Sequence, residues 1–415
     1  MIRPNVKLES YTYQISDVIL TSDKLDESIT IKNSFIRNIS INNDYDNNVT
    51  PSISLLANIE FNVYNDIVGY LSDMYATFSI SKTNIGVLNR DTTDEKNSDI
   101  SQLDDVITVT LKIANQYNMN TSETYYSGPD NSQTNDKSDR YKSIEVFLYD
   151  SKKIAKYKIG KSYIISGSSN DLLYLFFSDR SMNKILMSSG EFTGSKEYVI
   201  PYGHLGDNLK YLNDSFGLYR APYLFYMDLG RTYLLDKSKI SKTREKGEFE
   251  SVNIYLEQPE TVGYADTGCY IDNESGLYIL NANSFDINDK DSLIDFSFGG
   301  KLRTIQTGQR DVNDEIIGDY DVERTYVVPN EYAHEQIKYQ IKESRRDIVL
   351  SFSNIDTNII TPNKLYSIIP DPVYYDKKYD IGGSYRLAKS VIIYTKASDD
   401  EWQSLVTVFL NKIIK

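Results

Sequence analysis

Residues 198–235 read YVIPYGHLGDNLKYLNDSFGLYRAPYLFYMDLGRTYLL, and they predict a compact helix-plus-hairpin unit around which the remaining chain is arranged. Leu205, Leu209 and Leu212 recur at the spacing of one helical face, so the first half predicts an amphipathic helix after a short extended entry. Gly217 ends that pattern, as glycine commonly does at a helix C-terminus. The helix therefore has an apolar face that must pack against another element.

The second half of the same stretch predicts a β-hairpin. Tyr223–Asp228 and Thr232–Leu235 are apolar runs, and Leu229-Gly230-Arg231 between them is a turn. Upstream, the run SSNDLLYLFFSDRSMNKILMSSGEF begins at Ser168 with a capping residue and predicts helix, in two short pieces. Residues 168–236 thus predict an α/β insert, and no turn of the hairpin unit carries a catalytic-looking residue.

Alternating apolar and polar residues on both sides of the insert predict a mainly β chain, and residues 154–165 predict one of its strands. Residues 1–167 predict an N-terminal β-barrel, residues 237–339 a β-rich region that completes this barrel or links it onward, and residues 340–415 a C-terminal β-barrel. The last region has the most specific pattern, because two long alternating runs, Ile381–Tyr394 and Glu401–Leu410, flank an acidic turn. The fold class is therefore mainly β with an α/β insert, with two small β-barrels plus the α/β domain.

Length and charge narrow the range of possible functions. The 415 residues carry a formal net charge of −14, which opposes binding to a phosphate backbone. No apolar run reaches the ~18 residues that a membrane-spanning helix needs, and the N-terminal MIRPNVKLES lacks the apolar core of a signal peptide. We therefore expect a protein made in the cytosol, with no membrane anchor and no specific nucleic-acid site.

Few residues are suited to catalysis or metal binding. Cys269 is the one cysteine, which excludes an intrachain disulfide and a four-cysteine zinc site. Of the two histidines, His204 is expected at a helix cap or on the surface, and His334 on a solvated helix face. We expect no catalytic, cofactor-binding or metal-binding residue.

Two short segments imitate ligand-binding motifs without completing them. The segment ADTGCYIDNESG brings Asp266, Asp272 and Glu274 close together but lacks the EF-hand spacing of acidic ligands. The pair Gly299-Gly300 lacks the order of strand, glycine-rich loop and lysine that forms a phosphate cradle, so it predicts a bulge or turn. Neither segment predicts a cofactor.

Three segments near the C-terminus and one segment of the insert resemble a known protein family. They are TPNKLYSI (361–368), GSYRLAKSVIIY (383–394) and EWQSLVTVFL (401–410), which resemble the C-terminal barrel of phage tail hub proteins. The segment LKYLNDSFGLYRAPYLFYMDLGRTYLL (209–235) resembles the α/β insert of the same proteins, the baseplate hubs of contractile-tailed bacteriophages. The resemblance covers about a quarter of the chain and brings no catalytic residue with it.

The resemblance implies a structural virion protein of the tail baseplate, assembled in the host cytoplasm, and not an enzyme. It implies a homotrimer whose two similar barrels per subunit form a pseudo-sixfold ring between a hexameric tail tube and a trimeric central spike. The tail tube protein, the central spike protein and other baseplate proteins would be its partners. The acidic charge adds the hypothesis of an acidic bore through which DNA passes transiently without specific binding.

Two alternatives stay open at the level of the sequence. One is a receptor-binding or fibre-associated tail protein, in which exposed tyrosines, of which the chain has 35, and exposed asparagines bind a surface glycan. The other is a hydrolase that uses paired carboxylates such as Glu257 and Asp266. Neither carboxylate lies in an apolar context that would raise its pKa, which disfavours the hydrolase.

Overall fold

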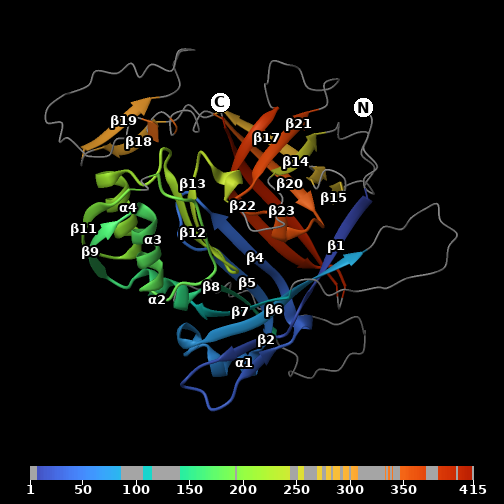
Figure 1. Ribbon diagram of the computed structural model, residues 1–415. Coiled ribbons are helices and arrows are strands. Elements are labelled where there is room, and N and C mark those ends of the chain that lie inside the picture. The colour runs from blue at the N-terminus through green and yellow to red at the C-terminus, as the bar shows by residue number, and fades with distance from the viewer. Residues whose placement is uncertain are drawn as a thin grey trace, which may run out of the picture.

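The protein is mainly β, and an insert of helices and short strands lies to one side of its large sheet (Figure 1). This computed structural model describes residues 7–85, 106–114, 141–191, 194–243, 251–256, 269–272, 277–281, 284–289, 293–298, 301–306, 332, 335–336, 339, 346–370, 382–398 and 401–413. The expected fold class, mainly β with an α/β insert, is confirmed.

The elements follow one another in three groups. Before the insert come β1 (Lys7–Ile15), β2 (Val18–Thr21), β3 (Ile29–Ile31), η1 (Asn33–Phe35), β4 (Ile36–Asp44), β5 (Ser52–Glu60), α1 (Phe61–Ile67), η2 (Leu71–Asp73), β6 (Tyr75–Ile85), β7 (Val106–Ile113) and β8 (Tyr141–Tyr149). The insert contains α2 (Ser151–Tyr157), β9 (Lys161–Gly167), α3 (Ser169–Ser178), β10 (Ile185–Met187), β11 (Lys196–Gly203), α4 (Leu205–Phe216), β12 (Tyr223–Met227), β13 (Thr232–Asp236) and η3 (Ile240–Lys242). After it come β14 (Ser251–Leu256), β15 (Cys269–Asp272), β16 (Leu277–Asn281), β17 (Ser284–Asp289), β18 (Leu293–Phe298), β19 (Lys301–Gln306), β20 (Arg346–Ser353), η4 (Thr357–Ile359), β21 (Leu365–Pro370), β22 (Gly383–Lys396) and β23 (Trp402–Lys412).

The strand pairings close a first ring. The order β22-β4-β5-β8-β7-β6-β1-β23 returns to β22, and each of these pairs is antiparallel. The ring is joined by a single residue pair where β1 meets β23, Tyr13 opposite Trp402. A sheet that returns to its first strand is a closed barrel, which leaves few unpaired edges.

A second ring of pairings uses the same closing strands. The order β22-β21-β14-β16-β15-β1-β23 also returns to β22, and β14 lies parallel to both of its neighbours. The predicted C-terminal hairpin is confirmed, because β22 and β23 pair over their length from Tyr385 opposite Lys412 to Lys396 opposite Trp402. Strands β1, β22 and β23 therefore belong to both rings.

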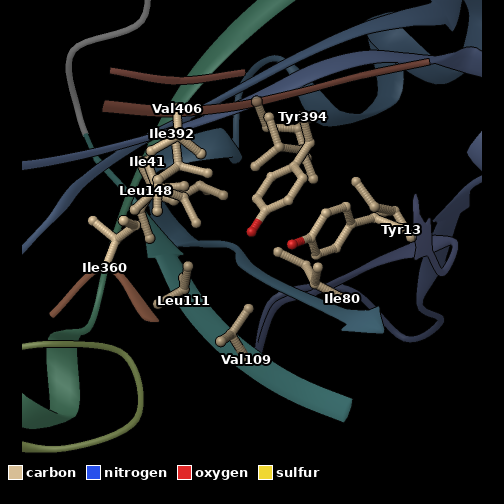
Figure 2. Packing of buried hydrophobic residues seen from close by; sticks show 14 of the residues in the cluster. Tyr13, Ile41, Ile80, Val109, Leu111, Leu148, Ile360, Ile392, Tyr394 and Val406 are labelled. Atoms are coloured by element: carbon tan, nitrogen blue, oxygen red, sulfur yellow. The ribbon is translucent and has the colours of Figure 1, made fainter. Parts of the chain in front are cut away.

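The inside of the first ring is filled by apolar side chains (Figure 2). Alternate residues of each strand point inward, as in β8, where Ile144, Val146 and Leu148 are buried and their neighbours are not. Many outward-facing residues are polar, and Thr77 and Thr110 of neighbouring strands hydrogen-bond to each other through their hydroxyls at 3.0 Å. The sequence alternation thus sets which face of each strand is the core.

The segment between β20 and β21 plugs this ring. Ile355, Ile359 and Ile360 are buried in the same core cluster as the barrel strands. The Tyr13 hydroxyl donates a hydrogen bond to the Ile355 carbonyl at 2.7 Å and accepts one from the Thr357 amide at 3.0 Å. The connection that leads from β20 into β21 of the second ring is therefore anchored inside the first.

The hairpin β12–β13 separates two hydrophobic cores. Leu224, Tyr226, Tyr233 and Leu235 pack into the barrel core, whereas Phe225, Met227 and Leu234 on the opposite face pack into the core of the insert. Both faces are covered because successive side chains of a strand point to opposite sides. The hairpin therefore fixes the insert to the barrel.

The helix α4 and the hairpin β12–β13 agree with the sequence prediction. Leu205, Leu209 and Leu212 are buried, and Gly217 caps the helix with the left-handed φ of 74° that glycine adopts without strain. The Asp207 carboxylate accepts a hydrogen bond from the His204 amide at 3.1 Å, which places His204 at the N-cap. The role of a helix cap expected for His204 is confirmed.

Two local predictions were wrong. Residues 154–165, expected as one strand, form the end of α2 and most of β9, because the Asp150 side chain caps the Lys153 amide and starts a helix. The second short helix expected after Ser178 is absent from the described residues there; a turn leads instead into β10, which pairs parallel to β13. Membership in a sheet, a non-local contact, overrides the helical spacing of this segment.

The predicted domain limits at residues 167, 236 and 339 stay predictions. Strands from both ends of the chain enter the first ring, so the barrel draws on residues well beyond the N-terminal region. His334, Glu257, Asp266, Glu274 and the pair Gly299-Gly300 lie outside the described residues.

Candidate interaction surface and the junction behind it

The described residues hold no group of three or more histidine, cysteine or acidic side chains that could bind a metal. Within the same ranges no helix is both long and apolar enough to cross a membrane. Cys269 and Asp272 lie in β15, opposite Leu280 and Leu277 of β16. The features that stand out are instead a polar junction at the base of the insert and an exposed apolar ribbon at its outer side.

An ion triad holds the insert against the barrel. Asp46, in the turn after β4, accepts hydrogen bonds from the Arg386 guanidinium of β22 and from the Lys237 ammonium after β13, each at 2.7 Å. The Arg386 side chain is fully buried. Burial alone would raise the pKa of the Asp46 carboxyl, but the two cations outweigh it and hold this pKa well below its usual range.

A chain of neutral polar groups continues the junction inward. The Tyr226 hydroxyl donates to the Asn43 carbonyl oxygen Oδ1 at 2.8 Å, and the Asn43 amide donates to the Ser390 hydroxyl at 3.1 Å. The rings of Tyr45 and Tyr226 meet edge to face at 4.6 Å between centroids. Strands β4, β12 and β22 are therefore joined by side chains whose polar atoms are paired, as buried polar groups require.

A second buried arginine organises the insert. Arg180, at the end of α3, donates to the Tyr163 hydroxyl of β9 at 2.7 Å, to the Asn208 oxygen Oδ1 of α4 at 2.7 Å and to the Phe176 carbonyl at 2.9 Å. It also donates to the Ile159 carbonyl at 3.2 Å. One planar guanidinium thus fixes α3, α4 and the start of β9 relative to one another.

Strands β9 and β11 form a two-stranded antiparallel ribbon with two different faces. The inner face packs on the helices, where the Tyr163 ring lies 4.8 Å from that of Phe176 between centroids. On the outer face Ile164 is 88% exposed and its cross-strand neighbour Val199 is 61% exposed. Tyr202, in the irregular end of β11, is 76% exposed. The described part of the chain therefore leaves this face uncovered.

The segment next to this ribbon is strongly basic. Residues 151–161 read SKKIAKYKIGK and contain five lysines and no acidic residue, although the whole chain has a net charge of −14. Lys153 is drawn inward, where its ammonium donates to the Leu229 carbonyl at 2.8 Å and burial lowers its pKa. Lys152 and Lys158 remain exposed. An apolar face thus borders a cationic edge.

A groove of about 360 Å³ lies beside the junction of β1 and β2. It is lined by uncharged groups, among them Gln14, Ser16, Asn33 and Ser79. Asn33 donates to the Ile15 carbonyl and accepts from the Trp402 indole, and the Ser16 hydroxyl accepts from the Ser79 amide. Most of these polar groups are therefore engaged with each other, and the groove is better explained as part of the barrel seam than as a glycan site.

Sequence reasoning missed both the ribbon and the ion triad. The paired apolar residues Ile164-Ile165 and Val199-Ile200 were a usable signal, because two adjacent apolar residues in a strand place one on each face. The triad had no such signal, since its three residues are far apart in the sequence. No catalytic site was predicted, and none of the residues weighed for one is brought together with another by the described structure.

Two solved structures are similar to this chain over most of its length: the tail protein from Neisseria meningitidis MC58, at 10% identity over 97% of both chains with a TM-score of 0.47, and the 43 kDa tail protein of prophage MuSo2 from Shewanella oneidensis, at 10% identity over 96% of this chain and 97% of that one with a TM-score of 0.49.

One curated protein is similar over a shorter part. A segment of 122 residues, 29% of this chain, is 29% identical to the "Putative D-3-phosphoglycerate dehydrogenase" of Schizosaccharomyces pombe. The chain covers 26% of the length of that relative.

The match to a protein family is far more extensive. The family model described as Bacteriophage PBS1 gene 109 protein matches residues 3–413, which includes both rings and the insert. The chain therefore belongs to the family of the bacteriophage PBS1 gene 109 protein, which confirms the resemblance to a phage protein.

Proposed function

We propose that this protein is a structural component of the phage tail, a baseplate hub whose homotrimer forms a ring between the hexameric tail tube and the trimeric central spike. The observation that carries the proposal is the pair of closed rings of strands that share β1, β22 and β23 within one chain. Three copies would present six such rings around one axis. That arrangement matches a sixfold partner on one side and a threefold partner on the other.

The way the rings are joined supports a mechanical role. Two barrels that share a hairpin of 14 and 11 residues cannot rotate independently without breaking its hydrogen bonds. The plug of the first ring and the ion triad at the insert add side-chain contacts to the same body. A rigid adaptor keeps the spacing of its binding surfaces constant under load.

The charge of the chain supports the passage of DNA through the ring. With a net charge of −14, an acidic bore repels the phosphate backbone and lets DNA slide without specific binding. The proposed hub assembles in the host cytoplasm and takes its place in the virion tail. Its partners there would be the tail tube protein, the central spike protein and other baseplate proteins.

Mass and symmetry of the purified full-length chain test the proposal directly. Native mass spectrometry across a concentration series is combined with two-dimensional averages of single particles. We expect trimers seen as rings with a central opening. A chain that stays monomeric at all concentrations, both alone and with its purified tube and spike partners, contradicts the ring.

A further inference from the structure

We propose that the outer face of the β9–β11 ribbon and the basic turn beside it bind a second copy of this chain. We define this ribbon surface by Lys152, Lys158, Ile164, Val199 and Tyr202. The inference rests on the proposed trimeric function and names one of the contacts that would hold its subunits together.

The apolar centre of the ribbon surface is the first argument. Ile164 and Val199 are 88% and 61% exposed and are cross-strand neighbours on one face of the ribbon, and Tyr202 at its irregular end is 76% exposed. Single exposed apolar residues are ordinary on a monomer, whereas neighbours on one face mark a site of association. The opposite face of the ribbon is already buried on α3 and α4, so the ribbon is held in place before any partner arrives.

The basic turn is continuous with this apolar centre. Gly160 lies between the C-terminus of α2 and the start of β9, and a Cβ built on it would come within 2.2 Å of the Tyr202 hydroxyl. The Tyr202 ring therefore lies over the turn that carries Lys158 and Ile159. Apolar contact and positive charge are presented side by side, on a scaffold fixed by Arg180.

Charge complementarity points to another copy of the chain as the occupant. The basic segment 151–161 belongs to a molecule with a net charge of −14, so the remainder of every copy is acidic. Two ribbon surfaces facing each other would place their lysines together and repel. The contact must therefore be heterologous, with a different and acidic surface on the neighbour, and such contacts form a ring when the rotation between subunits closes.

The chain has an acidic surface of the required kind. We define this tip surface by Ile19, Asp23, Asp26, Glu27 and Tyr70, at the turn between β2 and β3 and beside η2. Ile19 and Tyr70 are 41% and 42% exposed, and the three acidic residues are exposed. The salt bridge from Lys24 to Asp73, at 2.5 Å, holds the turn against η2. In Figure 1, β2 and α1 lie at the bottom of the view, while the insert lies at the left.

The test measures self-association of the full-length chain by sedimentation velocity and native mass spectrometry. In the variant Ile164→Ser/Val199→Ser we expect the trimer to weaken by at least about tenfold in dissociation constant, as for the loss of central interface residues. Val106→Ser is the matched control, because Val106 is 54% exposed on the barrel strand β7, and its trimer should be unchanged. Far-ultraviolet circular dichroism and the melting temperature show whether each variant is folded.

Charge reversal tests the identity of the partner. We expect the double variant Lys152→Glu/Lys158→Glu to weaken the trimer, and the double variant Asp26→Lys/Glu27→Lys to weaken it as well. We expect the variant that carries all four substitutions to form the trimer again. Recovery would show that the two surfaces meet, because a merely destabilised fold gains nothing from a second pair of substitutions.

The outcomes separate this inference from the proposed function. A wild-type trimer with folded ribbon variants that stay trimeric overturns the ribbon contact and leaves the ring standing. A wild-type chain that never associates with itself or on its partners overturns the ring. If folded ribbon variants remain trimeric but fail to support tail assembly, the surface binds another virion protein and the second-copy inference is wrong.

Discussion

Among single residues, Asp46 is the carboxylate that joins two cations where the insert meets the barrel. Its carboxylate pairs with the fully buried Arg386 guanidinium and with the Lys237 ammonium. A buried cation that loses its anion costs about 3–5 kcal/mol. Because the Asp46 side chain is 24% exposed, the lower end of that range applies.

We therefore expect Asp46→Asn to lower the free energy of unfolding by about 3 kcal/mol at pH 7. Urea denaturation followed by circular dichroism measures the change. Asp73→Asn is the control, because Asp73 pairs with Lys24 on the open surface and such pairs contribute little. Equal effects of the two substitutions would contradict the role of the triad.

The same residue predicts a pH dependence. Arg386 and Lys237 hold the pKa of Asp46 in the folded protein below its value of about 3.9 in an unfolded chain. Its contribution is therefore fully present above pH 3.9 and is lost as the pH falls through the folded pKa. The difference in unfolding free energy between wild type and Asp46→Asn should shrink below about pH 4, and a difference that is constant down to pH 3 would contradict this account.

Removing the Tyr13 hydroxyl group should also lower the stability of the protein. Its hydroxyl pairs with the Ile355 carbonyl and the Thr357 amide inside the first ring, and Tyr13→Phe leaves both groups buried without it. We expect a loss of about 1–3 kcal/mol in unfolding free energy. Hydrogen exchange should also quicken in residues 354–360. Tyr174→Phe, at a side chain that is 71% exposed, should change neither measurement.

At the scale of elements, the hairpin β12–β13 connects two cores, and adjacent residues of β13 probe them separately. Leu234→Ala should remove contacts from the insert core, and Leu235→Ala should remove them from the barrel core. Each should cost about 2–5 kcal/mol. Hydrogen exchange read by mass spectrometry should show faster exchange first in α3 and α4 for Leu234→Ala, and first in β4 and β5 for Leu235→Ala. Identical exchange patterns would mean that the two cores act as one.

The elements also show what could be predicted from sequence. The helix α4 and the hairpins β12–β13 and β22–β23 were found because their signals are local: apolar spacing, a glycine stop and short turns. The helix α2 was mistaken for a strand, since the β-branched Ile154 and Ile159 outweighed the cap at Asp150. Local sequence signals therefore identified several elements correctly, but they did not give the type and the boundaries of every element.

The candidate site was largely beyond such signals. The ion triad joins Asp46 to Arg386 across most of the sequence, and no spacing rule relates them. The exposed face of the ribbon depends on which of two adjacent apolar residues turns outward, and this is decided by the helices that cover the other face. Non-local pairing therefore has to be known before either feature can be described.

At the scale of the whole molecule, the seam where β1 meets β23 contains the one tryptophan of the chain. Trp402 is fully buried, and its indole donates to the Asn33 oxygen Oδ1 at 3.1 Å. Because both rings close through this pair of strands, opening the seam should unfold both. We expect the fluorescence of Trp402 and far-ultraviolet circular dichroism to follow coincident urea transitions. A fluorescence change that precedes the loss of β structure would show that the seam opens first.

The closure of the rings also has a consequence for how the protein is made. Strand β1 leaves the ribosome well before its partners β22 and β23 are translated. At bacterial elongation rates the early strands must wait on the order of tens of seconds for the strands that complete them. Nascent chains therefore stay open until β22 and β23 have been translated, and a product truncated before these strands lacks the seam needed to close either ring.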